Sequence, residues 1–155
     1  MRTLYHLWLS PFCRKVRIAL AEKKLEFELK AENPAERRAE FLALNPACDL
    51  PVLVVDGGPV IANSGAIGEY LEEVFPDPPL YPGAASERAE IRRLIAWFDI
   101  KFNHEVTNNL VGEKLLKRLR RLGAPYSRAI RAGRENFHIH MDYIAWLTER
   151  RNWLA

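Results

Sequence analysis

The chain has 155 residues and a formal net charge of +3, with 48% hydrophobic and 28% charged residues. That content supports one ordinary domain or two small ones with real cores, and the charged fraction favours solubility. No run of eighteen apolar residues is present and no basic-then-apolar leader precedes the first strand, so we expect neither a membrane span nor export. Two cysteines, Cys13 and Cys48, are too few for a disulfide framework and indicate a reducing cytoplasm.

Residues 1–80 predict strands and helices in alternation. Strands are expected at 3–9, 26–30, 52–55 and 60–62, and helices at 11–23, 36–44 and 64–74, the last of them capped by Ser64. An Asp-Gly-Gly turn at 56–58 joins the last two strands as a hairpin. The order βαβ followed by αββα predicts a four-stranded mixed sheet with helices on both sides, which is the thioredoxin-like form of an α/β (α+β) fold.

The junction of the first strand and the first helix holds a hydroxyl and a thiol. Pro11 suits the first helical position, which places Ser10 at the N-cap. The unpaired amides and the positive end of the helix dipole favour an anion there, including a thiolate. Two interpretations follow: Ser10 only caps and Cys13 only packs, or the two residues form a reactive site.

A proline-rich segment separates this half from a helical one. Residues 76–79 read Pro-Asp-Pro-Pro and stop the alternating pattern. Beyond it, one long helix capped by Ser86 is expected to run towards Leu119, and a second from about 126 to 151, with a break at Gly123-Ala124-Pro125. The second helix is expected to bury Ile130, Phe137, Met141, Ile144 and Leu147. The predicted organisation is therefore residues 1–76 as a thioredoxin-like domain, 77–84 as a linker and 85–155 as part of an all-helical domain.

Charge is distributed unevenly between the halves. Residues 1–80 carry a net charge of −3 and residues 81–155 a net charge of +6, with much of the excess between Lys114 and Arg134. This basic segment is either a solvated helix face or an attractor for an acidic partner. No aromatic side chains are interleaved for base stacking, which argues against nucleic acid. No Cys/His cluster has metal-ligand spacing, since His138 and His140 point apart on a helix, so no metal is expected.

Aromatic side chains of the two long helices lack an evident cover. Exposed apolar patches of that size mark a missing neighbour. We therefore expect either further chain after Ala155 or another subunit to cover Trp97, Phe98, Tyr143, Trp146 and Trp153.

Three ordered motifs resemble those of the glutathione transferase superfamily. They are Ser10-Pro11-Phe12-Cys13 followed by residues 16–20, Asn45-Pro46-Ala47 leading to residues 50–53, and residues 63–67 followed by Glu69-Tyr70-Leu71. The resemblance implies a thioredoxin-like domain, an all-helical domain and a two-fold dimer. The helical part found here is shorter than the resemblance implies, so we expect about a third of the protein to be missing after Ala155.

The resemblance also implies roles for individual residues. Ser10 would stabilise the thiolate of glutathione, with Cys13 as the second choice for a catalytic residue, and Pro51 matches a cis-proline. Leu50 would pair with the peptide through its backbone, and Ser64 would bind the γ-glutamyl carboxylate. Pro51 could instead be only a turn, and Ser64 only a cap.

Two departures from the family pattern weaken the expected glutathione site. Asn63 is uncharged where the family has an acidic residue for the glutathione amine, and Asp49 is negative where a donor would meet a carboxylate. Each change could cost about 1–3 kcal/mol of binding, so glutathione is expected to bind weakly.

A narrower resemblance adds a partner. Residues 92–99, 142–147 and 150–155 resemble alphaproteobacterial transferase-like proteins of cell division, which bind the tubulin homologue FtsZ. It implies docking of FtsZ, or of another acidic protein, on Leu110, Lys114, Lys117, Arg118 and Arg121. Three hypotheses remain: a dimeric FtsZ-binding scaffold, an active transferase that conjugates glutathione to electrophiles through Ser10, and a thiol oxidoreductase that uses Cys13.

Overall fold

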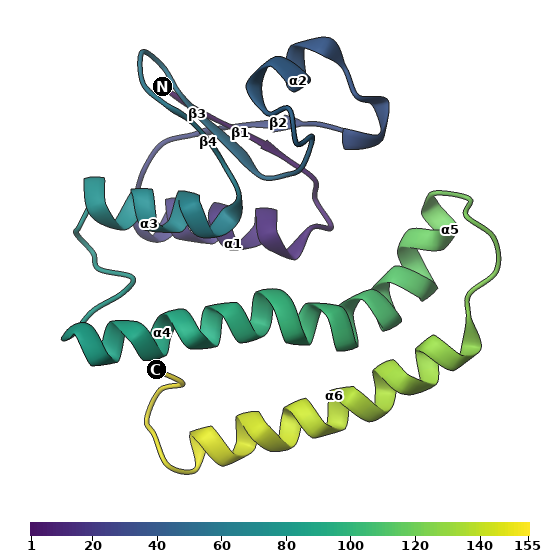
Figure 1. Ribbon diagram of the computed structural model, residues 1–155. Coiled ribbons are helices and arrows are strands. Elements are labelled where there is room, and N and C mark those ends of the chain that lie inside the picture. The colour runs from purple at the N-terminus through teal and green to yellow at the C-terminus, as the bar shows by residue number, and fades with distance from the viewer. The chain divides into compact units, whose positions relative to one another are not determined.

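The computed structural model describes residues 1–155, which divide into two compact units, Met1–Tyr81 and Pro82–Ala155. The first unit contains a sheet with helices, and the second is helical (Figure 1). None of the helices combines the length and the hydropathy of a membrane-spanning segment.

The first unit has the predicted thioredoxin-like sheet. Its four strands lie in the order β2-β1-β3-β4, with β2 parallel to β1 and the other neighbours antiparallel. In chain order the elements are β1 (Arg2–His6), α1 (Pro11–Glu22), β2 (Glu28–Ala31), η1 (Pro34–Glu36), α2 (Ala39–Leu44), β3 (Val52–Val55), β4 (Val60–Ala62) and α3 (Ser64–Val74).

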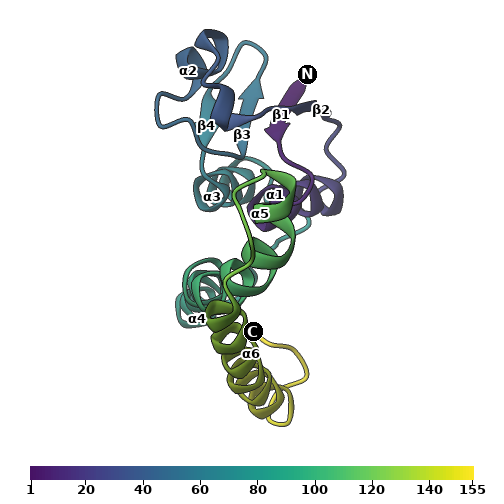
Figure 2. The same cartoon turned by 90° about the vertical axis from the view of Figure 1, so that its right-hand side faces the viewer.

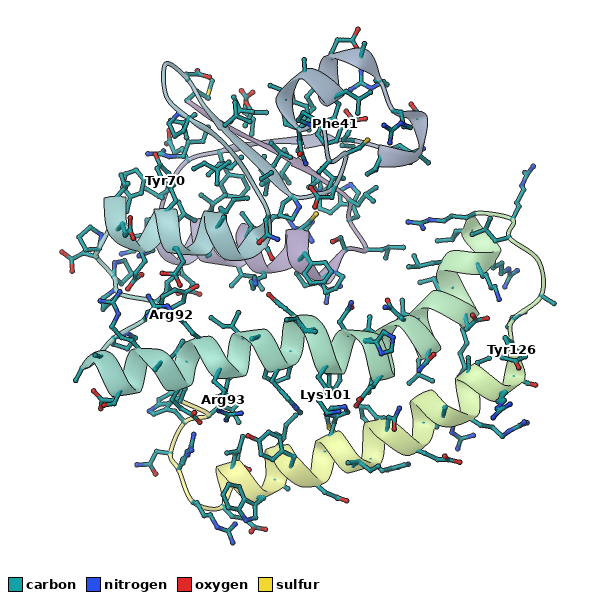
Figure 3. All side chains as sticks on the ribbon, viewed as in Figure 1. Phe41, Tyr70, Arg92, Arg93, Lys101 and Tyr126 are labelled. Carbon is teal, nitrogen blue, oxygen red and sulfur yellow. The ribbon has the colours of Figure 1, made fainter.

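The two faces of this sheet carry separate cores. Helices α1 and α3 lie on one face and α2 on the other, as both ribbon views show (Figures 1 and 2). Leu4 of β1 is fully buried against α1 and α3, in a cluster with Val16, Leu20, Leu53, Ile67 and Leu71. On the opposite face lies Phe41 of α2, which Figure 3 labels. Phe41 packs on Val52, and its ring centroid lies 5.7 Å from that of Tyr5. The period-two alternation of strand side chains produces this division.

Two local expectations for the first unit are wrong. The first strand ends at His6, not at Leu9, because a turn begins there: the Ser10 N–H donates to the Leu7 carbonyl at 3.2 Å. The cap of α3 is Asn63 and not Ser64. Asn63 adopts φ +78°, a left-handed region that Asn tolerates better than most residues, and its side chain can then reach the first amides of the helix.

A buried ion pair anchors the proline-rich segment within the first unit. The Lys23 ammonium donates to Glu72 at 2.9 Å and to the carbonyls of Phe75 and Pro78. The Glu72 carboxylate also accepts from the N–H groups of Leu80 and Tyr81. Burial pushes the pKa of Glu72 up, but these hydrogen bonds outweigh it and hold the pKa below its ordinary value. No local pattern in the sequence signals this pairing.

The second unit is a helical hairpin. Helix α4 (Ala85–Ala96) continues into η2 (Trp97–Leu116), which has the wider π-type winding, and ends in α5 (Lys117–Leu119); α6 (Ser127–Thr148) returns beside it. The two arms approach closely at Gly133, where an added Cβ would lie 2.7 Å from the Asn109 Cβ and 3.1 Å from Leu110. Figure 3 shows Arg93 on the side of α4 that faces α6, where it donates to the Tyr143 hydroxyl at 2.8 Å.

Three expectations for the helical unit need correction. Ser86 lies inside α4; its N-cap is Ala84, whose N–H donates to the Glu87 carboxylate at 2.6 Å. Phe137 is exposed, whereas His140 is buried and bonds to Glu105 at 2.8 Å. The aromatic group predicted to lack cover is split. Trp97 packs edge-on against His140 and Tyr143, and only Trp146 and Trp153 are largely exposed.

Candidate functional site

The sheet register brings three predicted site segments together at one end of the strands. Tyr5, near the end of β1, pairs with Val52 at the start of β3, and Val52 pairs with Ala62 at the end of β4. The residues that follow β1, precede β3 and follow β4 therefore meet at the same end of the strands. They include Ser10, Pro51 and Asn63, which are far apart in the sequence.

Ser10 is the N-cap of α1, as predicted. Its Oγ accepts a hydrogen bond from the Cys13 N–H at 3.3 Å, and Pro11 occupies the first helical turn. The hydroxyl hydrogen is not used by this contact, so Ser10 can cap the helix and still donate to an anion. The residue is partly exposed, which leaves this donor within reach of a ligand.

The two cysteines are both buried and serve the local structure. Cys13 is fully buried, and its Sγ accepts from the Leu7 N–H at 3.4 Å. The Cys48 thiol donates to the Pro34 carbonyl at 3.3 Å. A buried thiol cannot reach a substrate and is chemically inert in proteins. The geometry therefore favours a packing role for Cys13 over nucleophilic catalysis.

The Leu50–Pro51 peptide bond is cis, as the resemblance implied. The Pro51 carbonyl accepts from the Asn63 N–H at 3.2 Å, which joins the segment before β3 to the one after β4. Neither the N–H nor the C=O of Leu50 bonds to another residue of the chain. Both groups are therefore available to pair with an extended peptide, in the manner of an added strand.

Asn63 and Ser64 have different positions at the start of α3, and Asn63 is the residue that caps the helix. The Asn63 Oδ1 accepts from the Gly65 N–H at 2.8 Å and from the Ala66 N–H at 3.4 Å. Two amides that could otherwise bind a carboxylate are thus already capped. Ser64 is the first helical residue and is largely buried.

Asp49 is fixed by a neighbour that the sequence reasoning missed. The buried Asn45 amide donates to both the carbonyl and the carboxylate of Asp49, and its Oδ1 accepts from the Ala47 N–H. Asn45 thus shapes the loop that leads to Leu50 and keeps a negative charge beside it. An Asn followed by Pro before the expected strand was the available signal, because Asn often bonds to its own loop backbone.

His6 was also not predicted from the sequence as a site residue, and it packs against the loop that carries Ser10. His6 is buried and its Nδ1 has no hydrogen-bond partner, while its ring lies 4.6 Å from that of Trp8. Burial, with a smaller contribution from the Arg17 charge, lowers the pKa of His6. Arg17 also donates to the Trp8 carbonyl and lies over the Trp8 ring. These contacts join α1 to the loop that carries Ser10.

The predicted docking residues of the helical unit are not equivalent. Lys114, Arg118 and Arg121 are exposed. Lys117 pairs with Glu113 at 2.8 Å, and Glu113 also accepts from the Tyr126 N–H, so both contacts lower the pKa of Glu113. Leu110 packs beside Gly133 of α6. Leu110 therefore packs inside the hairpin and Lys117 is paired on its own helix, whereas the other three cations are exposed.

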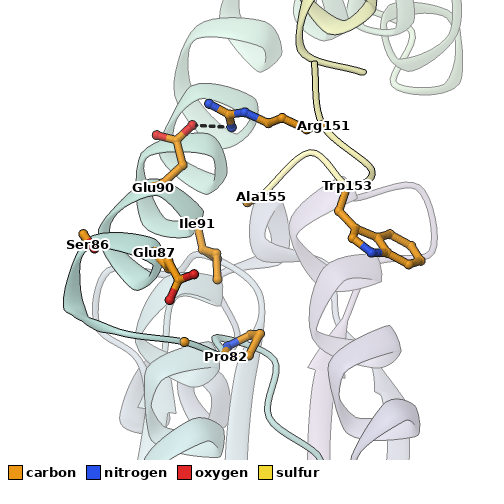
Figure 4. Close-up of a pocket in the computed structure, with 9 residues that line it drawn as sticks. Pro82, Ser86, Glu87, Glu90, Ile91, Arg151, Trp153 and Ala155 are labelled. Atoms are coloured by element: carbon orange, nitrogen blue, oxygen red, sulfur yellow. Dashed lines mark hydrogen bonds and ion pairs between the residues drawn. The ribbon is translucent and has the colours of Figure 1, made fainter. Parts of the chain in front are cut away.

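The helical unit also holds a cavity of about 610 Å³ between the start of α4 and the last residues of the chain (Figure 4). Its polar groups already pair with one another. Arg151 donates to Glu90 at 2.8 Å, and Arg93 binds the same carboxylate through both Nε and Nη2. Arg93 and Arg151 together lower the pKa of Glu90 to about 2. The cavity therefore offers a ligand no unpaired charge from this cluster.

No group of side chains anywhere in the chain has the makeup of a metal site.

Comparison with known proteins identifies relatives of both units. Residues 4–79 match the family model described as glutathione S-transferase, N-terminal domain. FtsZ-localized protein A of Caulobacter vibrioides (strain NA1000 / CB15N) is 46% identical over 157 aligned residues, which cover 99% of this chain and 69% of that protein.

Two solved structures have the same fold over nearly the whole chain. A glutathione S-transferase from Rhodospirillum rubrum F11 has a TM-score of 0.95 at 58% identity, and FzlA from C. crescentus has a TM-score of 0.93 at 45% identity. Each match covers 99% of this chain and 69% of the other protein.

Proposed function

This chain belongs to the glutathione S-transferase superfamily, and from that premise we propose that it is a cell-division factor that binds FtsZ filaments and has little or no transferase activity. The observation that carries the proposal is the 46% identity with FtsZ-localized protein A over 99% of the chain. The name of that relative states its localization to FtsZ, and the proposal extends this property to direct binding by the present chain.

The glutathione site supports the low-activity part of the proposal. The fold keeps the elements that would hold the peptide, namely the free backbone groups of Leu50 and the hydroxyls of Ser10 and Ser64. The charged contacts are absent or reversed, because Asn63 is neutral and already caps α3 while Asn45 holds the Asp49 carboxylate in place. Two such losses could move the affinity from micromolar towards millimolar.

Two measurements on purified protein test the proposal. FtsZ assembled with GTP should pellet the chain, and calorimetric titration with reduced glutathione should give a Kd on the order of millimolar. Tight glutathione binding without pelleting by FtsZ would replace the scaffold proposal with the enzymatic one.

An active transferase is the second candidate, and the geometry of Ser10 is the observation that favours it. The Ser10 hydroxyl retains a free hydrogen at the end of a helix, where it can donate to a thiolate and lower the pKa of glutathione. In this case the chain conjugates glutathione to electrophiles.

Replacing Ser10 with Ala tests the role of this hydroxyl. If the chain conjugates glutathione to an electrophilic aromatic compound, the rate should fall at least about tenfold, because the thiolate loses its hydrogen-bond donor. The loss of the α1 cap should also lower stability by about 1 kcal/mol. Ser10→Thr keeps both the hydroxyl and the cap and serves as the control. An unchanged rate in Ser10→Ala would remove Ser10 from the mechanism.

We further propose that the protein is a homodimer located in the cytoplasm. We propose the dimer because members of the family usually form dimers, and the cytoplasmic location because the proposed partner is FtsZ. Sedimentation equilibrium of the purified chain tests the dimer, and a fluorescent fusion tests the location.

A further inference from the structure

The turn of the helical hairpin combines an unusually one-sided charge with exposed aliphatic side chains. Residues 114–134 contain eight Lys and Arg and no Asp or Glu. Apart from Lys117, which is bound to Glu113, the cations of the turn form no ion pair: Lys114, Arg118, Arg120 and Arg121. A surface of this kind attracts and orients acidic partners.

Large apolar side chains are exposed among these cations. Leu119, Leu122 and Tyr126 are 60%, 62% and 57% exposed, and Val111 and Leu115 continue the series at spacings of four residues along the helix. Residues four apart lie on one side of a helix, so Val111, Leu115 and Leu119 form a short row that leads to the turn. We call the exposed residues of this region the hairpin tip: Val111, Lys114, Leu115, Arg118, Leu119, Arg120, Arg121, Leu122 and Tyr126.

The hairpin tip is a fixed feature and not a frayed end. The Glu113 carboxylate holds Lys117 on its own helix and accepts from the Tyr126 N–H at 2.7 Å, which ties the start of α6 back to η2. The exposed leucines are therefore presented in a defined arrangement. Binding to such a preorganised surface avoids the entropy cost of ordering it.

From this arrangement we propose that the hairpin tip binds an acidic, extended peptide segment that carries aliphatic side chains. This inference rests on the proposed function, because it identifies the part of the molecule that a filament partner would contact and the chemistry of the partner's segment. The cations steer an acidic chain to the tip, and the leucines bury aliphatic side chains once it is there.

Other occupants fit the tip less well. A membrane-surface helix needs a long apolar face, whereas here the exposed apolar row of Val111, Leu115 and Leu119 is short, because α5 ends at Leu119. A second copy of the tip would bring like charges together. Nucleic acid would find only one aromatic ring, Tyr126, for stacking.

Two labelled peptides of equal charge test the proposal on the full chain. The probes are four repeats of Glu-Glu-Leu and four repeats of Glu-Glu-Ser, with fluorescence anisotropy as the readout. The leucine peptide should bind about tenfold more tightly than the serine peptide. Leu119→Ser/Leu122→Ser should remove this difference, and Arg118→Glu/Arg121→Glu should weaken both peptides about tenfold or more.

Matched controls separate these effects from misfolding. Ile100 and Ile139 are 70% and 65% exposed, so Ile100→Ser/Ile139→Ser removes similar apolar surface elsewhere on the helices. Arg14→Glu/Lys24→Glu reverses two exposed charges in the first unit, as many as Arg118→Glu/Arg121→Glu reverses at the tip. Both controls should bind the two peptides as the unaltered chain does, with all thermal midpoints unchanged.

Several outcomes would overturn the inference. They are equal affinity for the two peptides, a difference that survives in Leu119→Ser/Leu122→Ser, leucine-dependent flotation with phosphatidylserine vesicles that the peptides do not inhibit, or leucine-dependent self-association. Pelleting with FtsZ is measured in parallel. If FtsZ does not pellet the unaltered chain, the proposed function fails; if it pellets the tip variants equally well, only the assignment of the tip fails.

Discussion

At the scale of single residues, we propose that the candidate site departs from the glutathione site of the family in charge and not in backbone shape. The Leu50–Pro51 bond is cis, the Leu50 backbone is free and Ser10 caps α1 with its hydrogen available. What changes is the chemistry of two side chains, Asn63 and Asp49. Each sits in a hydrogen-bonded position that a carboxyl or a carboxamide can occupy equally well, so their charges can be altered without altering the loop.

Exchanging these charges should strengthen glutathione binding. In Asn63→Asp the new carboxylate can still cap α3 and can also attract the glutathione amine. In Asp49→Asn a negative charge near the peptide's carboxylates disappears. We expect each change to tighten binding about tenfold by calorimetry, and the double variant to do so about a hundredfold.

The control for this experiment is Glu73→Gln, which removes an exposed negative charge from α3 away from the cap. It should leave the affinity for glutathione unchanged. Equal effects in Glu73→Gln and Asp49→Asn would mean that general electrostatics, and not the two site positions, governs binding.

At the scale of secondary-structure elements, close contacts decide how the helices pack. Gly133 of α6 has no room for a side chain, because η2 lies against it at Asn109 and Leu110. Gly112 on η2 is different, since a Cβ there would meet nothing closer than 3.9 Å. The two glycines therefore allow the effect of an added side chain to be compared in a crowded and an open position.

Replacing Gly133 with Val should lower the free energy of unfolding by about 1–3 kcal/mol, because the added methyl groups would force the two arms of the hairpin apart. Gly112→Ala should be neutral or stabilising by up to about 1 kcal/mol, since alanine has the better helix propensity. Chemical denaturation followed by circular dichroism measures both. Unaltered stability in Gly133→Val would show that the arms separate at no cost.

The Lys23–Glu72 pair makes the stability of the first unit depend on pH. The pKa of Glu72 lies below its ordinary value of 4.5, so its stabilising contribution is complete above that pH and is lost as the pH falls through the lower value in the folded state. Glu72→Gln should cost about 3–5 kcal/mol at neutral pH, because the buried ammonium of Lys23 loses its counter-charge.

Thermal unfolding of both proteins between pH 7 and pH 2 measures this dependence. The gap between the unaltered chain and Glu72→Gln should narrow as the pH falls below 4.5. A gap that stays constant down to pH 2 would exclude Glu72 as its source.

At the scale of the whole molecule, the excess positive charge is concentrated and not spread. The overall charge is only +3, yet the first unit is acidic and the basic residues gather at one end of the helical unit. A concentrated charge produces a local field that the net charge does not reveal. Retention on a cation exchanger should therefore depend on where a charge is changed.

Two double variants with the same net charge of −1 make this comparison. Arg118→Glu/Arg121→Glu should elute from a sulfopropyl column at about half the salt concentration needed for the unaltered chain, because the tip field collapses. Arg14→Glu/Lys24→Glu changes exposed cations of the first unit and should elute close to the unaltered chain. Identical elution of the two variants would mean that net charge alone controls retention.

Much of this protein could be predicted from its sequence, because local rules act over a few residues. Strands β3 and β4 begin and end where the β-branched runs and the Asp-Gly turn predict, and Pro11 marks the start of α1. The cis bond at Pro51 and the family followed from short motifs. Local rules also mislead where neighbours compete: Asn63 and not Ser64 caps α3, because an Asn can adopt a positive φ that brings its amide oxygen to the helix amides.

What tertiary structure alone decided are the contacts between residues distant in the chain. Burial of Lys23 with Glu72, of His140 with Glu105, and of Gly133 against Leu110 depends on elements 23 to 49 positions apart coming together, and no periodicity encodes such pairs. The same folding separates the basic residues into those that are ion-paired, such as Lys117, and those left unpaired, such as Arg118. The sequence determines which polar and charged side chains are present, whereas packing determines which of them remain unpaired and able to bind a partner.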